Sequence, residues 1–226
     1  MDRRASAPQQ RQPKASSRTA LVPASRLSGW VDRFAQSHGP LTEETDDGGI
    51  LLRAADGASA LLKAPWPVDG RPGRGTTDIE RLAALAGQER GLGILLVRRG
   101  GFAVAVASGS KVLESKSGNR YVQSRTAAGG QSQQRYARRR SNQADALVDS
   151  AAEHAARIFA SHRVEYLVPG GDRALVDLVL AQPSMRALAS RSQLAFLDVQ
   201  EPKTAALAKA ASDACSIRIL VTDPAP

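Results

Sequence analysis

The chain has 226 residues, which is enough for one large domain, or for one ordinary domain with an appendage, around a buried core. Its formal net charge is +9 and its sequence pI is about 10.4, so we expect a polyanionic partner, and nucleic acid is favoured over a membrane surface. Cys215 is the single cysteine, which excludes an intramolecular disulfide and a multi-thiolate metal site and fits a reducing cytoplasm; we expect it in the core.

The first 25 residues are rich in Ser, Gln, Pro and Arg without hydrophobic periodicity, which predicts a disordered basic tail. No apolar run there suits an export signal, and no window of the chain is long enough to span a membrane. We therefore expect a cytoplasmic protein without membrane contact.

Residues 26–75 are predicted to form a small accessory region and a linker. A short helix over residues 25–37 precedes a β-hairpin over residues 50–64, which turns at Asp56-Gly57. Three prolines and three glycines between Pro65 and Gly75 then predict a connector. We expect Trp66, within this connector, to pack in the core and not to stack on a base.

The predicted main domain covers residues 76–226 and opens with a helix from the capping box at Thr77 to about Gln88. Short β-rich runs separated by glycine turns at residues 100–101, 109 and 118–119 predict an antiparallel meander, over residues 93–98, 102–108, 111–116 and 120–125. The rest alternates in type, with helices over residues 132–161, 172–180 (capped by Asp172) and 202–212, and strands over residues 164–168, 194–199 and 216–221. This order predicts an α/β fold of the mixed-sheet, α+β kind.

Positive charge is concentrated before and within the first turns of the long predicted helix. Between Lys111 and Arg140 there are eight Lys and Arg residues and one acid, Glu114, so the local net charge is +7. Gly129-Gly130-Gln131 lies in this stretch, and paired glycines allow a backbone to come close to a ligand and present the glutamine to a crowded reaction centre. The candidates for RNA phosphate contact are Lys111, Lys116, Arg120, Arg125, Arg135, Arg138, Arg139 and Arg140.

Two segments, Lys111-Val112-Leu113-Glu114 and residues 129–138, resemble the catalytic middle domain of eukaryotic and archaeal class 1 peptide-release factors. In that family a meander leads into a Gly-Gly-Gln loop. A long helix follows, which opens with Ser, two variable residues, Arg, an aromatic residue, Ala and Arg; here these are Ser132 to Arg138. The resemblance covers about residues 90–226 and implies a ribonuclease H-like mixed sheet.

The chain has no recognisable codon-reading domain and no domain for a partner GTPase, so we do not expect stop-codon-dependent termination. It is more similar to the release-factor-like peptidyl-tRNA hydrolases of ribosome quality control, particularly to their compact actinobacterial relatives. This resemblance implies action on peptidyl-tRNA at the ribosome, at its large subunit. We further expect a monomer that needs no cofactor or metal. Gly129, Gly130 and Gln131 are the catalytic candidates, and Gln133 is a second candidate because that branch varies around the glutamine.

The implied reaction is hydrolysis of the ester between a nascent peptide and the terminal ribose of tRNA, which needs a positioned water and a stabilised oxyanion. A glutamine can supply both through its carboxamide and its backbone N–H. One alternative is a non-catalytic RNA-binding protein of the ribosome. Another is a metal-dependent nuclease, which is disfavoured because such chemistry needs clustered carboxylates and residues 93–125 contain only Glu114. The three histidines have no metal-ligand spacing and are expected to be ordinary surface or helix residues: His38, His154 and His162.

Overall fold

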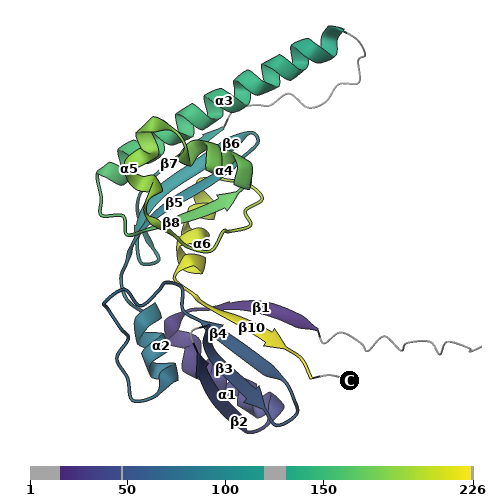
Figure 1. Cartoon of the computed structure of the whole chain (residues 1–226), viewed down its shortest axis with the longest axis vertical. Coiled ribbons are helices and arrows are strands. Elements are labelled where there is room, and N and C mark those ends of the chain that lie inside the picture. The colour runs from purple at the N-terminus through teal and green to yellow at the C-terminus, as the bar shows by residue number, and fades with distance from the viewer. Residues whose placement is uncertain (1–15, 47, 120–130, 225–226) are drawn as a thin grey trace, which may run out of the picture.

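The computed structural model describes residues 16–46, 48–119 and 131–224, except for the side chains of residues 46, 131–142 and 189. The described residues form two five-stranded sheets and six α-helices, so the predicted α/β class is confirmed. The two sheets are the centres of two lobes arranged along the long axis of the molecule (Figure 1). The more specific ribonuclease H-like assignment stays a prediction.

The sheet of the N-terminal lobe has the strand order β1-β10-β4-β3-β2, and all neighbours are antiparallel. Its strands are β1 (Ser17–Val22), β2 (Leu41–Asp46), β3 (Gly49–Ala54), β4 (Ser59–Lys63) and β10 (Ile217–Thr222). β3 and β4 are the predicted hairpin, and its turn requires Gly57 because φ there is 91°. α1 (Leu27–His38), which follows the 3₁₀ helix η1 (Ala24–Arg26), and α2 (Asp78–Ala86) bury Phe34 and Leu82 in the core on one face of this sheet.

Two predictions about the ends of the chain are wrong. Residues 17–22, expected within the disordered tail, form β1, which pairs with β10 along its whole length. The strand expected to close the main domain, over residues 216–221, is β10, and it lies between β1 and β4 in the N-terminal lobe. A strand pattern in a sequence does not name its partner, so only the folded chain shows that its two ends complete one sheet.

The sheet of the C-terminal lobe has the strand order β7-β6-β5-β8-β9. β5 (Gly91–Arg98), β6 (Gly101–Ser108) and β7 (Lys111–Asn119) are the first three strands of the predicted meander, and β8 (Tyr166–Gly171) and β9 (Ser192–Gln193) add in parallel. The predicted turn at residues 118–119 is wrong, because both residues extend β7. A Cβ at Gly118 would lie 2.6 Å from the Phe102 ring, so the glycine here permits close packing and not a turn. The fourth predicted strand, residues 120–125, lies outside the described residues.

Helices cover both faces of this second sheet. α3 (Gln131–Ala160) and α4 (Arg173–Leu180) pack on one face with Val104 and Phe102, and α6 (Thr204–Ala214) packs on the other with Ile94 and Ala105. The 3₁₀ helix η2 (Pro183–Met185) and α5 (Arg186–Ala189) connect α4 to β9. The strand expected over residues 194–199 is reduced to one bridge between Leu197 and Gly170.

Both predicted helix caps are present. The Thr77 side chain accepts a hydrogen bond from the Glu80 N–H at 3.1 Å, and the Glu80 carboxylate accepts one in return from the Thr77 N–H at 3.3 Å. Asp172 accepts a hydrogen bond from the Leu175 N–H at 3.3 Å and begins α4. These caps fix the N-terminal ends of α2 and α4.

Candidate RNA-facing site

α3 is the element that positions the predicted catalytic glutamine. Its C-terminal half is fixed to the sheet, because Ala151, Ala155 and Phe159 are buried against β5 and β6. Its N-terminal half extends beyond the sheet to the end of the molecule opposite the N-terminal lobe (Figure 1). Gln131 is the first residue of this helix. A 30-residue helix therefore carries position 131 well away from the core.

The structure covers the predicted site unevenly. Gly129, Gly130, Arg120 and Arg125 lie outside the described residues. Six other candidates fall in the first three turns of α3, where only the backbone is described: Gln131, Gln133, Arg135, Arg138, Arg139 and Arg140. The catalytic and RNA-binding roles of these residues therefore stay predictions.

The two remaining candidates, Lys111 and Lys116, are exposed on β7, an edge strand of the C-terminal sheet. Lys116 lies opposite Val104 and Lys111 lies opposite Ser108, and both partners belong to the α3-facing side of β6. Simple alternation would place positions 111 and 116 on opposite faces, but the register shifts after Val106. This bulge brings both lysines to the face that α3 covers.

Glu114 lies on the same face and is engaged by the far end of α3. Its carboxylate is 3.6 Å from Arg157 Nη1 and 3.2 Å from His162 Nε2. Within the described part of the chain, Lys111 and Lys116 form no ion pair with it or with any other acid. The one acid of the basic stretch is therefore engaged with α3 and His162 and not with the two lysines.

The histidines and the cysteine lie in separate surroundings. His38 Nδ1 is 2.8 Å from Asp56 Oδ2, whereas the His154 ring stacks on Phe102 with 5.7 Å between centroids. No group of three or more His, Cys, Asp or Glu residues within the described ranges could hold a metal ion. Cys215 is partly buried at the core of the C-terminal lobe, and this burial raises the pKa of its thiol to about 11, so the thiol is protonated at neutral pH.

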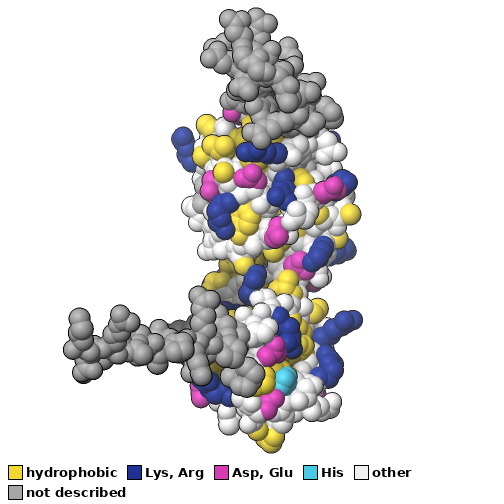
Figure 2. All heavy atoms as spheres, turned by 90° about the vertical axis from the view of Figure 1, so that its right-hand side faces the viewer, with side chains coloured by type: hydrophobic (Ala, Val, Ile, Leu, Met, Phe, Trp, Pro, Cys, Tyr) yellow, Lys and Arg dark blue, Asp and Glu magenta, His cyan; other side chains and the backbone are white. Residues whose placement is uncertain are grey.

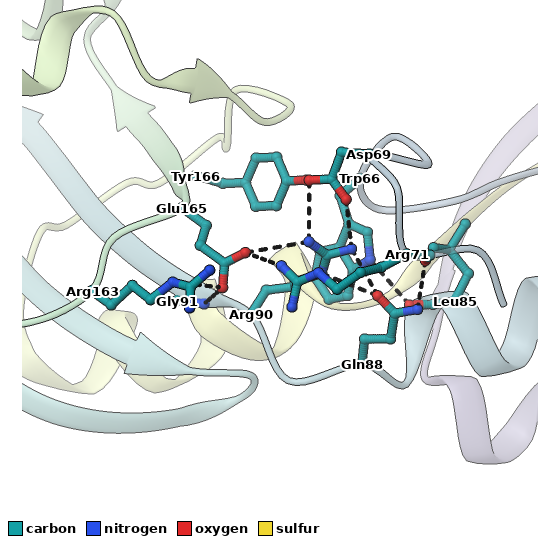
Figure 3. Close-up of polar contacts among 10 residues, drawn as sticks. All are labelled: Trp66, Asp69, Arg71, Leu85, Gln88, Arg90, Gly91, Arg163, Glu165 and Tyr166. Atoms are coloured by element: carbon teal, nitrogen blue, oxygen red, sulfur yellow. Dashed lines mark hydrogen bonds and ion pairs between the residues drawn. The ribbon is translucent and has the colours of Figure 1, made fainter.

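A polar cluster that we did not predict from the sequence lies where the lobes join (Figure 3). Its centre is Arg90, whose side chain is fully buried. Arg90 Nη2 donates to Asp69 Oδ1 at 2.8 Å and to Gln88 Oε1 at 2.7 Å, and Nη1 lies 3.3 Å from Glu165 Oε2. Tyr166 donates its hydroxyl hydrogen to Asp69. The only sequence signal was an arginine directly before a strand of buried residues.

The same cluster holds the connector between the lobes. Trp66 is 3% exposed and donates its indole N–H to the Leu85 carbonyl at 3.0 Å, so its predicted packing role is confirmed. Hydrogen bonds from Tyr166 and Arg90 lower the pKa of Asp69 to about 2. Burial, together with the hydrogen bond to Asp69, raises the pKa of Tyr166 to about 12. At neutral pH Asp69 is therefore ionised and Tyr166 is protonated, which is the arrangement that the cluster needs.

The sheet and the long helix of the C-terminal lobe indicate the class of protein to which the chain belongs. A mixed-sheet lobe with a three-stranded meander, followed by a long helix that begins at the glutamine of a Gly-Gly-Gln segment, is the arrangement of a release-factor-like protein. Residues 90–220 match the family described as the Actinobacteria/chloroflexi VLRF1 release factor. The match covers more than half of the chain, and the chain belongs to this family. No curated protein matches the chain.

Family membership confirms the resemblance that was based on residues 111–114 and 129–138. It gives the chain a release-factor-like function in translation, in association with the ribosome. In the portion of the chain that the structure describes, no helix has both the length and the apolar character needed to cross a membrane.

Proposed function

We propose that this protein hydrolyses the ester bond between nascent peptide and tRNA on stalled ribosomes or split large subunits in the cytoplasm. The observation that carries this proposal is the place of Gln131, at the start of a 30-residue helix whose other end is buried in the core. Such a helix is about 45 Å long. It can bring its first turn into a confined reaction centre while the two lobes remain outside.

Helical periodicity favours Gln131 over Gln133 as the essential residue. At about 100° per residue, positions 131, 135 and 138 fall on one side of α3. Position 133 falls instead on the side of the helix where, further along, Ala151 and Ala155 are buried against the sheet. Gln131 would therefore share its side of the helix with two arginines, and an arginine can bind phosphate oxygens bidentately.

The proposed chemistry uses the start of the helix as well as the glutamine side chain. The first four N–H groups of an α-helix have no intrahelical acceptor, so the Gln131 N–H can donate to the tetrahedral oxygen or to the departing ribose hydroxyl. The carboxamide orients a water that attacks the ester carbonyl carbon. The carbon–oxygen bond to the ribose breaks, and one proton of the water passes to the ribose oxygen. The products are tRNA and the peptide carboxylic acid, which releases the second proton to solvent at neutral pH. Glutamine is too weak a base to remove a proton from the water alone, so positioning is its main contribution.

The basic residues would bind the phosphates of tRNA and ribosomal RNA around this centre. Lys111 and Lys116 are exposed on the α3-facing side of β7 and make no ion pair within the described residues. The further proposed contacts are Arg120, Arg125, Arg135, Arg138, Arg139 and Arg140. We propose that the protein acts as a monomer and that its partners are peptidyl-tRNA and the large subunit.

The test is release of labelled peptide from peptidyl-tRNA held on stalled ribosomes or on isolated large subunits. We expect Gln131→Ala to lower the release rate by about 100-fold or more, because it removes the carboxamide that positions the water and keeps the backbone N–H. Binding to the large subunit should change less than about twofold, because the substitution removes no charge. Gln133→Ala is the matched control and should retain activity.

The same assay separates the alternatives. If the wild-type protein binds large subunits and releases no peptide at any concentration, the non-catalytic RNA-binding function takes the place of this proposal. If Gln133→Ala abolishes release and Gln131→Ala does not, the hydrolase function stands but our assignment of the glutamine is wrong.

A further inference from the structure

A groove of about 820 Å³ lies at the joint between the two lobes, far from the start of α3. Its apolar lining comes from both lobes and from the connector: Leu21, Pro65, Val68, Leu82, Leu85 and Leu194. Val68 has 60% of its surface exposed, although it is a large hydrophobic residue. A groove of this volume fits several residues of an extended peptide.

Two cations stand at one side of this groove. Lys63 on β4 and Arg218 on β10 are direct cross-strand partners, and both are exposed. Neither forms an ion pair within the described ranges. Like charges directly opposite each other on antiparallel strands repel, so an anion bound between them would be stabilising. Lys and Arg side chains are seen beside hydrophobic ones at the narrow waist of the molecule in Figure 2.

The other charges of the groove are already paired. Asp78 forms an ion pair with Arg81, and Asp213 Oδ2 lies 2.5 Å from Lys209 Nζ. The groove therefore combines an apolar lining with a local excess of positive charge from Lys63 and Arg218. This combination is complementary to a segment that carries both aliphatic side chains and carboxylates.

The aromatic content of the groove argues for a peptide and against RNA. Single-stranded nucleic acid is bound through bases that stack on exposed aromatic rings. Trp66 is the one aromatic side chain among the described lining residues, and it is only 3% exposed, with its indole N–H bonded to Leu85. The other lining side chains are aliphatic, proline, polar or charged, and none of them is an aromatic ring.

We infer that this groove is a docking site for an acidic, aliphatic peptide segment of a partner protein. The segment lies across the joint, with its aliphatic side chains against Val68 and Leu194 and a carboxylate between Lys63 and Arg218. Because both lobes and the connector contribute to the groove, the bound segment would restrict motion between the lobes. This site does not depend on the hydrolase function and can be tested separately.

The test uses the full chain and a display library of short random peptides. We expect the enriched peptides to combine Asp or Glu with Leu, Ile or Val, and to bind in a fluorescence anisotropy titration when synthesised. The double variant Lys63→Glu/Arg218→Glu should weaken this binding by about tenfold or more, because it replaces an attraction with a repulsion at two positions. Val68→Ser should weaken it through loss of apolar contact. Lys63→Arg/Arg218→Lys should retain it.

The matched control is Arg26→Glu/Arg33→Glu, which makes the same change in net charge at exposed positions on η1 and α1. It should leave peptide binding intact, and circular dichroism should show that both double variants are folded. The proposal is overturned if the library shows no acidic–aliphatic enrichment, or if the enriched peptides bind the Lys63→Glu/Arg218→Glu variant as tightly as the wild type. Displacement of the peptide from the groove by oligoadenylate would assign the groove to nucleic acid instead.

Discussion

At the residue scale, Arg90 accounts for how the joint between the lobes tolerates a buried charge. A buried guanidinium is strongly unfavourable unless its donors are bonded to acceptors, and here Asp69, Glu165 and Gln88 supply them. These residues come from the connector, the position directly before β8 and the segment after α2. The cluster therefore ties three segments together through one side chain.

The lowered pKa of Asp69 predicts how this cluster responds to acid. The folded pKa is about 2, below the ordinary value of about 3.9, so the unfolded chain binds more protons between these values. The stabilisation is complete above about pH 4 and is lost as the pH falls through about 2. We expect Asp69→Asn to lower the free energy of unfolding at pH 7, and the difference from wild type to shrink below about pH 4.

Urea unfolding at several pH values between neutrality and about pH 2.5 would measure this difference. Asp177→Asn is the control, because Asp177 is exposed on α4 and its side chain forms no ion pair within the described residues. A difference between Asp69→Asn and wild type that is constant across the range would contradict the proposed bonding of Asp69.

At the element scale, the bulge in the β6–β7 pairing gives β7 a basic face toward α3. Lys111 and Lys116 share that face, and neither forms an ion pair in the described structure. We expect Lys111→Gln/Lys116→Gln to weaken binding to large ribosomal subunits. Each lysine that contacts phosphate should also contribute about one to the slope of log affinity against log salt, so the slope should fall by up to about two.

A salt series of binding measurements tests this, with Lys203→Gln/Lys209→Gln as the matched control. Those two lysines are paired with Glu201 and Asp213, each at 2.5 Å. Lys203 directly precedes α6 and Lys209 lies within it, and α6 covers the opposite face of the sheet. Equal losses in the two double variants would indicate a general charge effect and would remove β7 from the RNA-binding surface.

The sequence patterns predicted the long elements better than the short ones. The predicted helix over residues 132–161 is α3 over Gln131–Ala160, and Leu147 and Phe159 are buried as its periodicity indicated. β2 was not predicted because Leu41–Asp46 is mostly polar. It is an edge strand of its sheet, and such a strand does not need the apolar alternation of a buried strand. β9 has only two residues, which is too short for a periodic signal.

At the scale of the whole molecule, the chain passes twice between the lobes. It leaves the N-terminal lobe after α2 and returns after α6, to place β10 between β1 and β4. β10 contributes three buried residues to the N-terminal core: Ile217, Ile219 and Val221. The N-terminal lobe is therefore built from segments at both ends of the chain. The family match begins at residue 90, after the first of these segments.

This topology predicts that a chain ending at Ala214 loses the N-terminal lobe and keeps the C-terminal lobe. Removal of β10 leaves β1 without a partner and takes three side chains from the core. Hydrogen exchange should show loss of protection in β3 and β4, with β5 and β6 still protected. Leu220→Ser, which changes an exposed side chain of β10 and leaves the strand in place, is the control. Protected β3 and β4 amides in the shortened chain would contradict this account.

The sequence by itself determined the α/β class, the family, the helix caps at Thr77 and Asp172, and most element boundaries. These depend on local periodicity and short motifs, which are visible along the chain. The catalytic assignment of Gln131 also comes from the sequence and stays a prediction.

Only the tertiary structure decided that β10 joins β1, that Lys111 and Lys116 share a face, and that Arg90 and the groove lie at the joint. Each of these depends on which distant segments pack together, and a local pattern carries no information about the partner of a strand or of a buried charge.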